Sequence, residues 1–150
     1  MTFPASGCFA NTFTGALKGT IALDLTLATH KVALYTNAVG AADLTTDVGY
    51  NAGGWTTGEV ANGGGYTTGG ALIVSPTYAH TAGGVVMWDA ADPSWATATI
   101  TARGAMYYAN ALAGKNGIVA QTFGADIVST GGTFLITLAA GGLFSVDWVP

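Results

Sequence analysis

Short runs in which apolar and polar residues alternate, each closed by a turn signal, set the strongest constraint on the fold of this chain. Alternation with a period of two places every second side chain on one face of a β-strand, whereas an amphipathic helix needs a period near 3.6. The turn signals recur at short intervals, as at Gly83-Gly84, Asp92-Pro93 and Gly141-Gly142. This pattern predicts a mainly β fold, an antiparallel β-sandwich of jelly-roll-like form.

The predicted strands start near residue 21 and continue to the end of the chain. In the first of them, large apolar residues occupy every second position from Ile21 to Leu27. Valine and threonine residues in the run that follows disfavour a helix, because β-branched side chains are restricted in a helical turn. The predicted strands span residues 21–27, 31–36, 71–75, 85–89, 96–101, 102–108, 118–123, 133–138 and 144–148.

Residues 1–19 carry the one pattern that predicts a helix. Phe9, Phe13 and Leu17 recur at the spacing of one helical face, Ser6 is a candidate N-cap, and Gly19 is a candidate stop. We expect a short helix that lies on the sheet. A membrane-surface helix would need a basic polar face, which this segment does not have.

Residues 37–70 show neither the period of two of a strand nor the period near 3.6 of a helix, and they are rich in Gly, Ala, Thr and Asn. A loop of this length inside a compact domain is uncommon and is usually a binding loop or a disordered tether. Tyr50, Trp55 and Tyr66 are spaced along it and allow two interpretations of equal weight. Either the segment is an extended arm whose aromatic side chains anchor it in a partner, or these side chains fold back onto the edge of the sheet. The first interpretation makes these three residues the candidate interface.

The chain carries few charges for a single domain of 150 residues. Charged residues make up 8% of the sequence and the net charge is −4, whereas a soluble surface usually needs about one quarter charged residues. We therefore expect much of the surface to be covered by copies of the chain itself or by another protein. The basic residues are scattered, which argues against nucleic acid as a partner because phosphate binding needs clustered cations.

The sequence predicts neither a signal peptide nor a membrane span. Its first residues lack the basic and apolar regions of a signal peptide. Residues 127–146 are uncharged and long enough to cross a bilayer. However, paired glycines and the alternation around Phe134 and Ile136 indicate a strand between two turns. Cys8 is the only cysteine, so it forms no internal disulfide and is expected to be a small buried residue.

Candidate catalytic groups are sparse, and we expect no enzyme activity, no metal ion and no cofactor. His30 and His80 have no acid or nucleophile paired with them in the sequence, so each is predicted to be a surface or capping residue. The glycine cluster at 63–70 lacks the lysine of a P-loop and the spacing of a dinucleotide-binding motif. Its glycines are expected to supply turn conformations.

Asp89 and Asp92 are the one pair of acids that suggests chemistry, because they lie three residues apart between two tryptophans. Two carboxylates beside aromatic rings are typical of glycosidases, and carboxylate oxygens also bind Ca²⁺. The surrounding sequence lacks the further oxygen donors of a calcium loop. A turn in which the Asp92 side chain bonds the backbone is the better explanation.

Several stretches of the sequence resemble small virion proteins that are encoded among the structural genes of tailed bacteriophages. The resemblance covers most of residues 31–137 and implies a β-rich, capsid-associated protein without catalytic activity. It defines no functional residues. The stretches that carry it are residues 31–37, 58–70, 95–109, 121–126 and 131–137.

Three functional hypotheses follow, in order of preference. The first is a capsid cement or decoration protein of the virion, which binds itself and adjacent major capsid subunits or another virion protein. The second is a tail or fibre component, an adhesin that binds a host glycan or protein through exposed aromatic rings. The third is a carbohydrate-active enzyme that uses Asp89 and Asp92.

Overall fold

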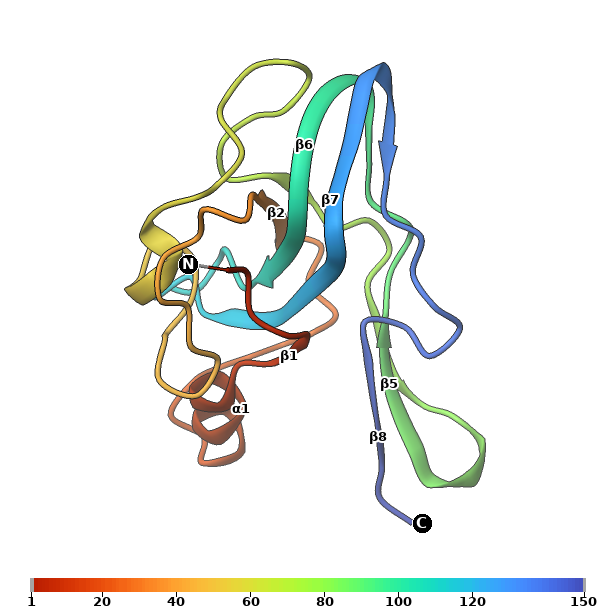
Figure 1. The fold of residues 1–150 in the computed structure, drawn as a ribbon. Helices are drawn as coiled ribbons and strands as arrows, with labels where there is room; N and C mark the ends of the chain where they lie inside the picture. The colour runs from red at the N-terminus through yellow and green to blue at the C-terminus, as the bar shows by residue number, and fades with distance from the viewer. Residues whose placement is uncertain (1, 150) are drawn as a thin grey trace.

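The computed structural model describes residues 2–149 (Figure 1). Within these residues it contains eight strands, one α-helix and two short 3₁₀ helices. In chain order the elements are β1 (Gly7–Cys8), α1 (Ala10–Leu17), β2 (Lys31–Tyr35), η1 (Gly53–Thr56), β3 (Ala71–Leu72), β4 (Thr77–His80), η2 (Ala82–Gly84), β5 (Val85–Asp89), β6 (Ser94–Tyr108), β7 (Gly117–Leu135) and β8 (Phe144–Asp147).

The strands form two antiparallel sheets, which confirms the predicted mainly β, sandwich-like fold. One sheet has five strands in the order β1-β7-β6-β2-β3, and the other has three in the order β4-β5-β8. A shared apolar core, which contains Leu34 of β2 and Trp88 of β5, joins the two sheets. Figure 1 shows the β5 and β8 strands extending below the rest of the chain on the right, close to the C-terminus.

The hairpin of β6 and β7 is far longer than the predicted strands. Its pairing runs from Tyr108 opposite Gly117 to Ser94 opposite Leu135, with register shifts at four places. In the widest irregularity, Arg103 of β6 lies opposite residues 123–126 of β7. Such irregularities bend a strand pair and increase its twist. The two strands accordingly arch over the top of the molecule in Figure 1.

The predicted strand breaks inside this hairpin were wrong. No break falls between residues 101 and 102, where the sequence carries no turn signal and β6 is continuous. Gly131 and Gly132 were predicted to form a turn but lie inside β7. Gly131 has a φ of 64°, so it supplies a local irregularity in the strand and does not reverse the chain.

Strand β2 is buried on both faces, which is the central fact of this architecture. Val32 and Leu34 face the core shared with the three-stranded sheet. Ala33 and Tyr35 point to the opposite face and into a second apolar cluster. That second cluster is built from the N-terminal segment, from β2 and the loop after it, and from β6 and β7. It comprises Phe3, Phe9, Ala33, Tyr35, Val39, Tyr50, Trp55, Met106, Tyr108 and Ala120.

Residues 37–70 are therefore a folded layer, and the prediction of an extended arm was wrong. The first part of this segment, with Val39, Tyr50 and Trp55, covers the second face of the five-stranded sheet, contains η1, and leads to the bridge between Tyr35 and Glu59. Val60 and Tyr66 pack in the core shared with the three-stranded sheet. The described chain exposes 7146 Å², close to the roughly 7,000 Å² expected for a compact monomer of this mass. No large projecting segment adds surface beyond that expectation.

The N-terminal helix exists but is shorter than predicted, and its cap is different. Helix α1 starts after Phe9, which makes no side-chain cap and is buried in the second cluster. Ser6 lies outside the helix, where its hydroxyl accepts a hydrogen bond of 3.0 Å from the Thr122 amide. Gly19 follows the helix with a φ of 72°, as expected for a helix stop.

The strand predicted at residues 21–27 does not form. Two side chains of the core bind the backbone carbonyls of this segment: the Trp88 indole donates to Leu25 at 2.8 Å, and the His30 ring lies 2.7 Å from the carbonyl oxygen of Asp24. These bonds occupy groups that a strand would use for a neighbouring strand. The alternating leucines of the segment instead contribute single side chains, such as Leu25, to the core.

The uncharged stretch at 127–146 contains the end of β7 and the start of β8, as the prediction of strands requires. Among residues 2–149, no helix is long and apolar enough to cross a membrane. Helix α1, the only α-helix in residues 2–149, has eight residues.

We predict that Gly70→Ala destabilises the fold much more than Gly19→Ala. The two glycines have nearly the same φ, 73° and 72°, so the added methyl group strains the backbone equally, by about 1–2 kcal/mol. At Gly70, however, the methyl group would collide with the Val32 carbonyl, whereas it meets open space at Gly19. We expect Gly70→Ala to lower the free energy of unfolding by at least about 3 kcal/mol, measured by urea denaturation. Equal losses in the two variants would contradict the close approach of residues 37–70 to β2.

Candidate functional site

The three aromatic residues predicted to anchor a partner lie inside the chain's own core. Tyr50, Trp55 and Tyr66 are 6%, 0% and 2% exposed. Ring centroids of Phe3 and Tyr35 lie 5.4 and 5.1 Å from that of Trp55, in edge-to-face geometry. The interpretation that these residues fold back on the sheet is therefore the correct one. In this fold they are not available as interface residues.

Glu59 ties this aromatic layer together through three hydrogen bonds. Its carboxylate accepts from the Tyr50 and Tyr66 hydroxyls at 2.8 Å each, and from the Gly69 amide at 2.6 Å. The Tyr66 oxygen also accepts from the Leu34 amide of β2 at 3.0 Å. The Glu59 carboxylate thus joins Tyr50 and Gly69 to Tyr66, and Tyr66 in turn binds β2.

The tyrosines around Glu59 are uncharged structural groups. Tyr50 stacks on Tyr108 with ring centroids 4.5 Å apart and planes 9° apart, and the Tyr108 hydroxyl donates to the Gly69 carbonyl at 2.7 Å. Burial, together with the nearby Glu59 charge, raises the pKa of Tyr108 to about 12. Burial first, and then the Glu59 carboxylate, also raises the pKa of Tyr50 well above its usual range. These hydroxyls stay protonated and act as hydrogen-bond donors.

Glu59 is the residue that sequence reasoning missed. The available signal was that Glu59 is the only glutamate in the chain and lies in a segment made mostly of small residues. A lone half-buried carboxylate needs compensating donors. The tyrosines at positions 50 and 66 were the nearest candidates in sequence.

Asp89 and Asp92, the acid pair of the sequence, have different surroundings. Asp89 is the last residue of β5, opposite Thr77. Asp92 accepts a hydrogen bond of 2.9 Å from the Leu138 amide, so it binds backbone as predicted but joins segments 46 residues apart. Among the residues that the structure describes, no three His, Cys, Asp or Glu side chains are grouped as metal ligands.

His30 and His80 have opposite environments. His30 was predicted to be a surface or capping residue, but it is 1% exposed and packs edge-to-face on Trp88. Its Nε2 carries the proton, because its neighbour at 2.7 Å is a carbonyl oxygen, and its buried Nδ1 has no partner in the described chain. Burial lowers the pKa of His30, against the opposing effects of the Asp24 carbonyl and charge. His80 is exposed, as predicted for a surface residue, and it ends β4.

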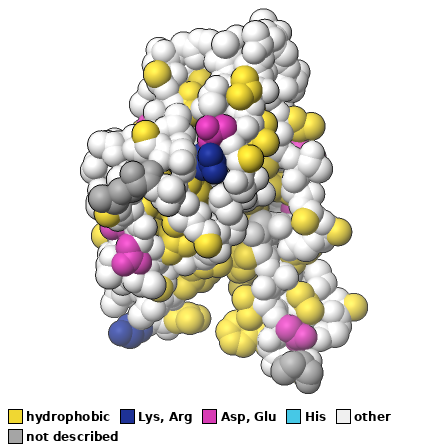
Figure 2. All heavy atoms as spheres, in the orientation of Figure 1, with side chains coloured by type: hydrophobic (Ala, Val, Ile, Leu, Met, Phe, Trp, Pro, Cys, Tyr) yellow, Lys and Arg dark blue, Asp and Glu magenta, His cyan; other side chains and the backbone are white. Residues whose placement is uncertain are grey.

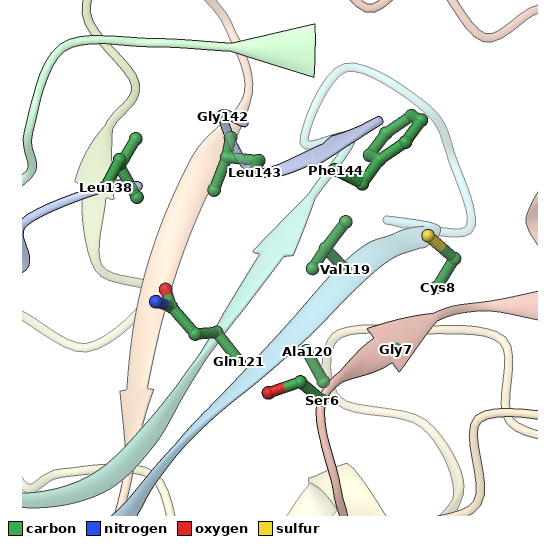
Figure 3. Close-up of a pocket in the computed structure, with 10 residues that line it drawn as sticks. All are labelled: Ser6, Gly7, Cys8, Val119, Ala120, Gln121, Leu138, Gly142, Leu143 and Phe144. Atoms are coloured by element: carbon green, nitrogen blue, oxygen red, sulfur yellow. The ribbon is translucent and has the colours of Figure 1, made fainter. Parts of the chain in front are cut away.

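An open groove lies where β1 and β7 meet the segment before β8 (Figure 3). Its cavity has a volume of about 310 Å³ and is lined by Ser6, Gly7, Cys8, Val119, Ala120, Gln121, Leu138, Gly142, Leu143 and Phe144. A second cavity of about 330 Å³ shares Gln121 and is lined further by Thr122, Phe123, Ile127, Phe134, Leu135, Ile136 and Thr137. None of these side chains is charged, so the groove offers an apolar, neutral surface.

Three polar side chains line the groove: Ser6, Cys8 and Gln121. Gln121 Oε1 accepts a hydrogen bond of 3.1 Å from the Tyr107 hydroxyl, and Figure 3 shows the Gln121 amide pointing toward Leu138. Cys8 was predicted to be buried but is an exposed thiol at the groove wall. Partial burial raises the pKa of the Cys8 thiol, so it is protonated at neutral pH and is not an activated nucleophile.

Exposed large apolar side chains occur at several places, among them Leu17, Leu72 and Val74, and two groups of them lie on the sheets. Tyr78, Val146, Trp148 and Val149 lie on or directly after the three-stranded sheet. Ile127, Val128 and Leu135 lie on the outer part of β7. Figure 2 shows hydrophobic side chains gathered between the two lower lobes of the molecule, with few charged side chains on this view. The ion pair between Arg103 and Asp126, at 2.7 Å, joins β6 to the β7 irregularity.

Comparisons with protein-family profiles, with curated proteins and with solved structures gave no match for this chain. The described residues offer two uncharged cavities with mostly apolar walls and a core made of the chain's own side chains.

We predict that Glu59→Ala lowers the free energy of unfolding by about 2–4 kcal/mol, because it leaves two tyrosine hydroxyls and one amide without their acceptor. Glu59→Gln keeps an acceptor oxygen of the same shape and should cost less than half as much. Urea denaturation followed by tryptophan fluorescence measures both. Wild-type stability in Glu59→Ala would show that the carboxylate does not hold this layer.

We predict that His30 makes the protein less stable at pH 5 than at pH 7. Its pKa is lower in the folded state than the usual 6.5 of an unfolded chain, so the unfolded state binds the proton first as the pH falls. The stabilising contribution is complete above pH 6.5 and is lost as the pH falls toward the folded-state pKa.

The measurement is the free energy of unfolding at pH 7, 6 and 5 for the wild type, His30→Gln and His80→Gln. We expect the loss to disappear in His30→Gln and to remain in the exposed control His80→Gln. An unchanged pH profile in His30→Gln would assign the loss to other groups.

Proposed function

We propose that this chain is a non-enzymatic structural component of a tailed-bacteriophage virion, a capsid cement or decoration protein that binds adjacent major capsid subunits. The observation that carries the proposal is the set of exposed apolar side chains on the β6–β7 arch, Ile127, Val128 and Leu135, with the uncharged groove beside it. The arch also carries the ion pair of Arg103 with Asp126. A protein that works by docking needs such a surface, and it needs a rigid scaffold to present it.

The chemistry of the surface supports a protein partner. Lys and Glu are depleted at the centres of protein interfaces, whereas apolar and aromatic residues are enriched there. Val128 and Leu135 are 64% and 53% exposed on β7, and the cavity lined by Leu135 has no charged side chain in its wall. A charged or phosphorylated ligand would lose its hydration there without gaining a counter-charge.

Three side chains that could perform chemistry have structural partners, which supports the same proposal. Glu59 binds tyrosines, His30 binds a carbonyl, and Asp92 binds an amide. The resemblance of several stretches to small phage virion proteins points to the particle as the place of work. The docking surface proposed here replaces the loop around Trp55, which lies in the core.

The location is tested by gold-labelled antibody fragments against this chain on intact particles of the phage that encodes it. Label on the head supports the proposal. Label confined to the tail or fibres supports the alternative of a tail component or adhesin, in which the exposed Trp148 ring is the candidate for stacking on a sugar. Particles without label would overturn both.

We predict that Val128→Asp weakens binding of the purified chain to heads that lack it by at least about tenfold, because docking would bury an unpaired carboxylate. Thr14→Asp is the matched control, since it adds the same charge at an exposed polar position of α1, outside the arch. Binding is measured by co-sedimentation with the heads. Equal binding of the two variants would remove the β6–β7 arch from the docking surface.

A further inference from the structure

The outer edge of the three-stranded sheet carries backbone groups without hydrogen-bond partners. Strand β4 is the edge strand next to β5, and all four of its residues are exposed. The Thr81 amide donates to the Val85 carbonyl at 2.7 Å, so residue 81 faces β5. By alternation Thr77 and Ala79 also face β5, and the amides and carbonyls of Tyr78 and His80 point away from it. Nothing in residues 2–149 binds these outward groups.

This edge lacks the features that normally prevent strands from pairing between molecules. Protein edge strands are commonly protected by a charge, a proline or a bulge. Residues 77–80 carry none of these, and the register with β5 is continuous from Thr77 opposite Asp89 to His80 opposite Val86. Pro76, directly before β4, limits the open edge to these four residues. The remaining form of protection is shortness, since β4 has four residues.

The opposite edge of the same sheet is protected. Strand β8 ends at Asp147, whose carboxylate accepts a hydrogen bond of 2.9 Å from the Val149 amide. This bond occupies an edge donor and places a negative charge on the strand. A strand added at this edge would have to displace that bond and lie against the Asp147 carboxylate, and a charged side chain on an edge strand opposes such pairing. The two edges therefore differ in their capacity to pair.

We infer that β4 pairs with β4 of a second copy of this chain around a two-fold axis at Ala79. In this antiparallel arrangement Tyr78 of each copy faces His80 of the other, and the two residues exchange backbone hydrogen bonds. Ala79 faces its own counterpart in the non-hydrogen-bonded pair, where Cα atoms approach to about 4.5 Å. Four hydrogen bonds form, and the two sheets become one of six strands.

The charge and symmetry of the edges favour a second copy as the occupant. Strand β4 has no charged residue, so two copies meet without like-charge repulsion. Pairing of β4 with β8 of the next molecule would be head-to-tail and would not close, which generates filaments. The protected β8 edge opposes that arrangement. The two-fold contact uses only the open edge and stops at two molecules.

The contact is small, which sets its expected strength. A standard interface takes about 800 Å² from each partner, roughly a ninth of the 7146 Å² that this chain exposes. A four-residue strand edge with the Tyr78 ring supplies less than that. We therefore expect a dimer with a dissociation constant in the micromolar range or weaker. It forms at the high local concentrations of an assembly and dissociates on dilution.

The first test is sedimentation velocity of the purified full chain from about 5 to 500 μM, a range that brackets such a dissociation constant. We expect a monomer–dimer equilibrium without larger species. Ala79→Lys should raise the dissociation constant by about fivefold or more, because two ammonium groups meet at the axis. Ser145→Lys adds the same charge on the same face of the opposite edge strand and should leave the equilibrium unchanged.

The second test is disulfide trapping, which does not depend on a change in stability. In a Cys8→Ser background, Ala79→Cys should give a covalent dimer on mild oxidation, because the two Cβ atoms lie within reach of a disulfide. Ser145→Cys in the same background should give none. A monomer at every concentration, a dimer that Ala79→Lys does not weaken, concentration-dependent filaments, or equal trapping of both cysteines would each overturn the inference. No virion is needed, so the result is independent of the proposed function.

Discussion

A β-strand whose two faces are both apolar must be covered on both sides, and β2 imposes this requirement on the whole chain. Its odd- and even-numbered residues point into two separate clusters. The three-stranded sheet covers one face. The other face is covered by the N-terminal segment and by residues 37–60, which have almost no regular secondary structure. Because the covering layer is irregular, side-chain bonds hold it in place, and Glu59 provides three of them.

The sequence predicts the parts of this fold that follow from local periodicity. The strand at 85–89 has the predicted bounds, and the strand at 31–36 is one residue shorter than predicted. Such strands can be predicted from sequence because their apolar and polar residues alternate strongly and turn signals bound them on both sides. Residues 21–27 alternate as clearly, yet the side chains of Trp88 and His30 bind their carbonyls. Bonds that cross 63 residues of sequence, as that of Trp88 does, leave no local pattern.

In the candidate site, too, some features could be predicted from local sequence and others depend on contacts between distant residues. Tyr50, Trp55 and Tyr66 stood out because large aromatic residues are rare in glycine-rich segments, but no period indicated whether they point toward the sheet or the solvent. The groove depends on which residues of β1, β7 and the segment before β8 meet, which is a property of topology. Cys8 and Gln121 could not be selected from sequence because neither belongs to a motif. The scarcity of charge was visible in the sequence, and the structure places the exposed apolar groups on β7 and around β8.

The pairing of β1 with β7 has a consequence for how the chain is made. Gly7 lies opposite Ala120, and the Phe9 amide donates to the Ile118 carbonyl. A ribosome releases the N-terminal segment first, while its partner strand is more than one hundred residues away in synthesis. Phe3 and Phe9 have no completed cluster to enter until β7 emerges. During translation this segment thus finds its partner only after more than one hundred further residues have been made, and its two phenylalanines stay open to chaperones or to neighbouring nascent chains until then.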